Sequence, residues 1–140
     1  MITLETKDLK GDALDWAVKY VDLLILAMDK TRRRPFKADH DIALEIINMS
    51  NTEIPELNAE RIMHMVKSER IAAFEDGDWF ATKSDDLTTW SRDQDGDIAH
   101  VMIYEAETIR GSTYEESIAR CYVQSVVGNT IAIPYKLVKV

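Results

Sequence analysis

Apolar residues recur at helical spacing over a long stretch near the start of the chain. From Ala13 to about Lys30, the polar positions Asp15, Lys19 and Asp22 form a narrow stripe, and apolar side chains occupy most of the remaining circumference. We therefore predict a long first helix there, with Asp12 as its N-cap. A helix this apolar needs cover on more than one face. It is either a central core helix or, in part, the interface of a homodimer.

Three shorter stretches also predict helices. One spans Asp41–Met49 with Asp39 as its cap, and another runs from the cap Asn58 to about residue 68. The last helix is predicted over Tyr114–Val127. Signals at both of its ends support these bounds: Thr113 and Glu116 have the spacing of a capping box, and Gly128 suits a left-handed C-terminal position.

Strand-like alternation separates and flanks these helices. The first nine residues alternate loosely and predict an edge strand, and residues 98–105 alternate more regularly. Arg70–Glu75 and Trp79–Lys83 flank Gly77, which predicts a hairpin because glycine tolerates positive φ. Residues 131–133 form a short extended segment. We therefore expect a single α+β domain over residues 1–140, in which a long N-terminal helix and a C-terminal helix pack on a small, mainly antiparallel sheet.

Composition narrows the classes of function. The 140 residues are 46% hydrophobic, enough for a core, and 25 acidic against 17 basic residues give a net charge of -8. This balance argues against general coating of DNA or RNA, which needs a basic surface. The single cysteine excludes an intrachain disulfide framework and fits a reducing compartment. No apolar run approaches the roughly 20 residues of a membrane span, so we expect a soluble, intracellular protein.

Motifs for metal binding and catalysis are weak. The acidic string 93–97 lacks the terminal glutamate and flanking helices of a calcium loop. His40, His64 and His100 have no zinc-ligand spacing, and Cys121 lies on the apolar side of the last helix, as a buried structural cysteine does. We expect no metal and no cofactor. Nothing in the sequence demands catalysis.

Charge is segregated along the chain. A basic connection follows the first helix, with Arg32, Arg33 and Arg34 at its centre; it complements the helix dipole or binds an anion such as a nucleotide phosphate, an RNA or an acidic protein face. Residues 75–97 are strongly acidic, which is typical of a solvated face or of a surface for a basic partner. Trp90 lies in the polar loop of this segment and is a candidate contact residue.

Two stretches near opposite ends of the chain resemble one family. Ala13–Val18 (ALDWAV) and Arg120–Val123 (RCYV), followed by Gly128 and the Ile-Pro pair at 133–134, are similar to the opening and closing signatures of the NinX-like proteins of temperate phages and prophages. The Asp76-Gly77-Asp78-Trp79 turn resembles the central strand pair of that family. The family's glycine- and tryptophan-containing middle element has no counterpart in residues 51–65, and the helix predicted over 41–49 is additional.

The resemblance implies a phage or prophage product acting in the bacterial host cytoplasm; it implies no reaction. Most matching positions are apolar, which favours a fold signature, but Asp15 and Arg120 are charged. These two residues either pair between the first and last helices or line a shared pocket.

Our leading expectation is a non-enzymatic accessory protein that binds a host protein or a small anionic ligand, as an anti-defence or host-modulating factor does. A homodimer through the first helix is compatible with it, and neither nucleic acid nor membrane is its expected partner. Two alternatives stay open. One is a nucleic-acid-associated regulator that uses Arg32–Arg34, and the other is a small nucleotide-handling enzyme that uses Asp15, Arg120 and the acidic loop.

Overall fold

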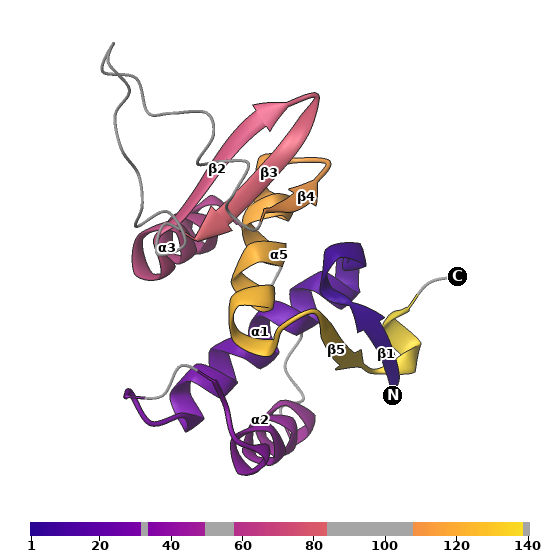
Figure 1. Cartoon of the computed structure of the whole chain (residues 1–140). Helices are drawn as coiled ribbons and strands as arrows, with labels where there is room; N and C mark the ends of the chain where they lie inside the picture. Colours follow the sequence, from indigo (N-terminus) through magenta and orange to yellow (C-terminus); the bar gives the residue numbers. More distant parts are fainter. Residues whose placement is uncertain (32–33, 50–57, 84–107, 139–140) are drawn as a thin grey trace. The chain divides into compact units, whose positions relative to one another are not determined.

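The computed structural model describes residues 1–31, 34–49, 58–83 and 108–138 (Figure 1). The chain divides into two compact units, the first made of residues 1–57 and 122–140 and the second of residues 58–121. The strand predicted over residues 98–105 and the loop that carries Trp90 lie outside the described residues. The single domain over residues 1–140 stays a prediction.

The first unit joins the two ends of the chain in a small sheet. Strand β1 (Ile2–Glu5) pairs antiparallel with β5 (Thr130–Ile133), so that Ile2 lies opposite Ile133 (Figure 1). In β5 the isoleucines are buried and alternate with exposed residues. The strand predicted at the N-terminus is thus confirmed for its first half. Residues 6–8 form a 3-10 turn, in which the Thr6 hydroxyl donates to the Gly128 carbonyl oxygen at 3.1 Å.

Helix α1 (Gly11–Ala27) is the predicted long helix, with different ends. Its N-cap is Lys10, whose carbonyl oxygen accepts from the Leu14 N–H; Asp12 therefore lies in the first turn and is not the cap. The helix also ends before the predicted Lys30. The Asp29 carboxylate accepts from both the N–H and the hydroxyl of Thr31, each at 2.9 Å, and such local bonds compete with helix continuation.

The apolar surface of α1 is buried over most of the helix. Nine of its residues are buried, and the helix contacts both β5 and α2 of its own unit. This burial agrees with a central core helix. Exposed apolar residues of α1 gather at its C-terminal end, at Ile25 and Leu26. The homodimer through α1 stays a prediction.

Helix α2 (Lys37–Met49) begins four residues before its predicted start. Asp39 is therefore not the cap. It lies buried in the first turn, where its carboxylate accepts from the Phe36 N–H at 2.7 Å. The carboxylate still satisfies a backbone donor at the helix start, but it does so from inside the helix. Ala43 and Ile47 are buried, and the helix packs against α1.

Helix α5 (Tyr114–Val127) has the predicted bounds. Gly128 has a φ of +86° and ends the helix in the left-handed conformation, as predicted. The boundary between the two units falls inside this helix, after Cys121. Within the first unit, the Tyr122 hydroxyl donates to the Asp22 carboxylate at 2.5 Å and so fixes the end of α5 to α1.

The second unit combines a helix with a three-stranded antiparallel sheet. Asn58 caps α3 (Ala59–Glu69) as predicted, its side chain accepting from the Arg61 N–H at 2.9 Å. The predicted hairpin is confirmed as β2 (Ile71–Asp76) and β3 (Asp78–Lys83), and the turn residue Gly77 has a φ of +80°. A further strand, β4 (Ile109–Gly111), was not predicted; it pairs antiparallel with β3.

This sheet has buried residues on both faces, and Thr82 is only 2% exposed on the face opposite Ala81. Ile71, Ala81 and Ile109 share one face by register and are buried. Their strands contact α3 and the first half of α5, where Trp79 meets Tyr114 edge to face at 5.4 Å. The α+β class is therefore confirmed. The expected single sheet is divided into two small antiparallel sheets, because β1 pairs with β5 and not with β2, β3 or β4.

The close approach of β4 to α5 gives the first testable prediction. A Cβ on Gly111 would lie 2.8 Å from the Ser117 Cα and closer still to its backbone nitrogen. We expect Gly111→Ala to lower the free energy of unfolding by about 2–3 kcal/mol, because backbone cannot move aside as a side chain can. Urea unfolding measures the change. The exposed neighbour substitution Ser112→Ala should cost less than about 0.5 kcal/mol, and equal losses would contradict the close approach.

Candidate functional site

The structure places only some of the predicted site residues. Asp15 lies half-buried on α1 in the first unit, and Arg120 lies on α5 in the second. Arg34 is exposed between α1 and α2. Arg32, Arg33 and Trp90 lie outside the described residues. The pairing of Asp15 with Arg120 therefore stays a prediction.

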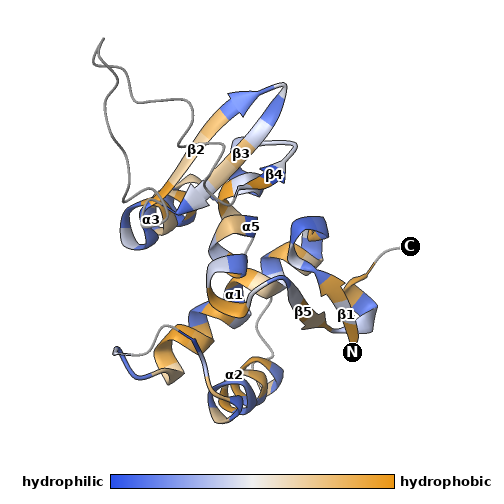
Figure 2. Cartoon of the chain, in the orientation of Figure 1, coloured by the Kyte–Doolittle hydropathy of each residue, from blue (hydrophilic) through white to orange (hydrophobic). Residues whose placement is uncertain are grey.

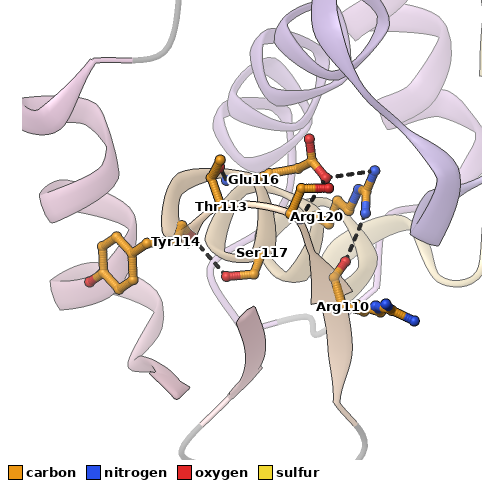
Figure 3. Close-up of polar contacts among 7 residues, drawn as sticks. Arg110, Thr113, Tyr114, Glu116, Ser117 and Arg120 are labelled. Carbon is orange, nitrogen blue, oxygen red and sulfur yellow. Dashed lines mark hydrogen bonds and ion pairs between the residues drawn. The ribbon is translucent and has the colours of Figure 1, made fainter. Parts of the chain in front are cut away.

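Arg120 joins α5 to β4 (Figure 3). Its Nη2 lies 3.0 Å from Glu116 Oε1, one helical turn away, and its Nη1 donates to the Arg110 carbonyl oxygen at 2.8 Å. The Arg120 side chain is only 11% exposed. The Arg120 guanidinium thus binds a backbone carbonyl of β4 and a carboxylate of α5 at the same time. Such contacts are typical of a residue that fixes a strand against a helix.

Glu116 also takes part in the start of α5. Its N–H donates to Thr113 Oγ1 at 3.1 Å, which confirms the helix cap expected from the sequence. The same Glu116 Oε1 that faces Arg120 accepts from the Ser112 N–H at 3.0 Å. One carboxylate therefore serves both the helix N-terminus and the guanidinium. The cap and the ion pair form one network of hydrogen bonds (Figure 3).

Other basic side chains of the second unit also face acidic ones. Arg110 forms an ion pair with Asp78 on the neighbouring strand, and Lys83 lies 3.1 Å from Glu69. An anionic ligand would have to compete with these carboxylates. The described contacts around Arg120 therefore favour a structural role over an anion-binding one.

A second polar cluster, which sequence reasoning missed, lies between α1 and α2. The Tyr20 hydroxyl lies 2.7 Å from His40 Nδ1, and Trp16 stacks on the Tyr20 ring at 5.1 Å. Burial, aided by the nearby Asp41 carboxylate, raises the pKa of Tyr20 to about 12. Tyr20 therefore stays protonated well above neutral pH, and its hydroxyl is hydrogen-bonded to His40 Nδ1. Trp16 and Tyr20 share a helix face by spacing, but His40 joins them only through the packing of α2.

The outer side of α2 carries exposed apolar side chains. Ile42, Ile46 and Met49 are 46%, 45% and 75% exposed, and their spacing of four and then three positions places them on one helix face. We call these three residues the α2 stripe. Figure 2 shows hydrophobic and hydrophilic residues following one another along this helix. The sequence identified these residues as apolar but could not show which of them α1 leaves uncovered.

Candidate metal and membrane features are absent from the part of the chain that the structure describes. There, no group of three or more His, Cys, Asp or Glu side chains could hold a metal ion. No helix within residues 1–31, 34–49, 58–83 and 108–138 is long and apolar enough to cross a membrane. Cys121 is buried, as predicted. His100 and the acidic string 93–97 lie outside these ranges.

The role of Arg120 can be tested by substitution. We expect Arg120→Ala to lower the free energy of unfolding by about 2 kcal/mol, because it leaves the partly buried Glu116 carboxylate and the Arg110 carbonyl without their shared donor. Arg120→Lys should lose less, since lysine keeps the charge but not the two-armed geometry. Chemical denaturation measures both. An alanine variant as stable as the wild type would contradict the structural role.

The Tyr20 cluster makes stability depend on alkaline pH. The pKa of about 12 lies above the ordinary value of 10.0, so the folded state holds this proton more tightly than the unfolded chain. The stability that the protonated Tyr20 contributes is fully present below pH 10 and is lost as pH rises from about 10 to 12. The free energy of unfolding falls in this window by at most about 1.4 kcal/mol per pH unit. Tyr20→Phe should be less stable than the wild type near neutral pH, and the gap should shrink across this window. Urea unfolding at several pH values measures it. The exposed Tyr135→Phe should keep the wild-type pH dependence, and a constant gap for Tyr20→Phe would contradict the raised pKa.

Comparisons of the chain with family models, with curated proteins and with solved structures found no match.

Proposed function

We propose that this chain is a non-enzymatic, phage-encoded accessory protein that binds a host protein in the bacterial cytoplasm. The α2 stripe is the contact surface in this proposal. The phage origin is supported by the resemblance of Ala13–Val18 and Arg120–Val123 to the NinX-like signatures. The choice of a protein as partner is supported by the exposure of α2.

The exposed apolar area of the α2 stripe is the observation that carries the proposal. Isolated exposed apolar residues are ordinary on protein surfaces, but three on one helix face form a continuous strip. Aliphatic anchors at such spacing are the usual means by which one helix binds another protein. Burying the exposed parts of these side chains would contribute roughly 3–4 kcal/mol. That is enough to anchor a partner, although further contacts are needed for tight binding.

A small anionic ligand is less well supported. Of its candidate residues, Arg32 and Arg33 lie outside the described residues, and the guanidinium of Arg120 contacts Glu116 and the Arg110 carbonyl oxygen. Two alternatives stay open. A regulator that uses Arg32–Arg34 would show nucleic-acid binding that weakens with salt. A nucleotide-handling enzyme that uses Asp15, Arg120 and the acidic loop would show turnover.

Native mass spectrometry of protein purified gently from a bacterial host tests the proposal. We expect the wild type to carry a stoichiometric protein partner. The double variant Ile42→Ser/Ile46→Ser should lose it, with affinity at least about tenfold weaker, since each substitution removes about 1 kcal/mol of buried apolar contact.

Met63→Ser is the matched control, because Met63 is 58% exposed on α3 in the other unit. This variant should retain the partner. Thermal melting shows that each variant is folded. A partner retained by the double variant would contradict the proposal, as would a nucleotide-sized ligand released on denaturation with no protein bound.

A further inference from the structure

We infer that the α2 stripe binds a basic amphipathic helix of its partner, one with apolar anchors along one face and Lys or Arg beside them. This inference rests on the proposed function and adds the chemistry of the partner. It follows from the shape of the exposed face, from the charges that border it and from the arrangement that a second copy would create.

The shape of the exposed face suits a helix. Ala43 and Ile47 are buried where α2 packs on α1. The α2 stripe lies on another face of the same helix, where a second helix can pack against it. From Ile42 to Met49 the helix rises about 10 Å, the length of two turns. A partner helix with anchors at positions i, i+4 and i+7 would present its ridge to the same length of α2.

The charges beside the α2 stripe are acidic. Asp41 and Glu45 are both exposed and precede Ile42 and Ile46 by one position each, so they form a row along one side of the stripe. Lys37 is the only lysine or arginine within α2. Two carboxylates one turn apart repel each other by a few tenths of a kcal/mol, and a row of cations on a partner helix would turn this repulsion into attraction. The net charge of -8 also draws basic partners toward the chain.

A second copy of the chain fits this face less well. Suppose that two copies paired antiparallel through the α2 stripe about a two-fold axis. Asp41 and Glu45 of one copy would then lie on the same side of the helix pair as Asp41 and Glu45 of the other. Asp41 and Glu45 would then face the same two residues of the other copy, and such like-charge contacts oppose association. A partner of opposite charge has no such cost.

Two synthetic peptides test the inference. Both are 18-residue amphipathic helices with leucine anchors at positions i, i+4 and i+7; one carries lysine at the flanking positions and the other glutamate. Fluorescence anisotropy measures the binding of each labelled peptide to the whole chain at low and at high salt. We expect the lysine peptide to bind at least about tenfold more tightly, and its affinity to fall several-fold with salt.

Matched variants identify the surface. Asp41→Asn/Glu45→Gln should weaken binding of the lysine peptide about fivefold and reduce its salt dependence, and Ile42→Ser/Ile46→Ser should weaken it about tenfold or more. Glu60→Gln/Glu115→Gln removes the same charge from two exposed residues of the other unit, outside the acidic segment 75–97, and should leave binding unchanged. Met63→Ser should also leave it unchanged. Thermal melting of each variant verifies its fold.

Several results would overturn the inference. Equal affinity for both peptides, with loss in the isoleucine variant, would reject the basic partner and leave the proposed function standing. Equal weakening by the Glu60/Glu115 control would show general charge attraction. No binding of the lysine peptide, or self-association of the chain through the α2 stripe, would also reject it. The proposed function itself fails only if native mass spectrometry shows no partner that depends on the isoleucines.

Discussion

The burial of α1 is the interaction on which the first unit depends. Nine of its seventeen residues are buried, and β5 and α2 both contact it within that unit. Polar bonds fix these neighbours at defined places: Tyr20 bonds His40 of α2, and Asp22 accepts from Tyr122 at the end of α5. Such bonds add little net stability, but a buried hydroxyl without a partner is costly. They therefore select one arrangement among the many that apolar burial alone would allow.

This arrangement leaves α2 with two apolar sides and only one of them covered. Ala43 and Ile47 are buried, whereas Ile42, Ile46 and Met49 remain in water. A helix whose only task were to cover α1 would gain nothing from the second set, since its exposure lowers solubility without adding to the core. The proposed binding function accounts for the second set. The acidic residues beside it, Asp41 and Glu45, favour a basic partner over an acidic one.

Sequence patterns predicted the elements best where the signals were local. The bounds of α5 agree at both ends because Thr113, Glu116 and Gly128 act on their own neighbours. The end of α1 was wrong because the Asp29–Thr31 bonds depend on side-chain geometry rather than on periodicity. Strand β4 has three residues, too few for a pattern. The Tyr20–His40 contact and the exposed side of α2 could not be predicted, since both depend on how two helices pack.

The pairing of β1 with β5 has a consequence for synthesis of the chain. The second unit is continuous in sequence over residues 58–121, so all of it is synthesised before the last strand of the first unit. β1 and α1 acquire their contacts with β5 and Tyr122 only later, because these partners lie a hundred or more residues further along the chain. The nascent chain thus carries its most apolar helix without its final cover until β5 has been made. A chaperone would have its best opportunity to bind during that interval.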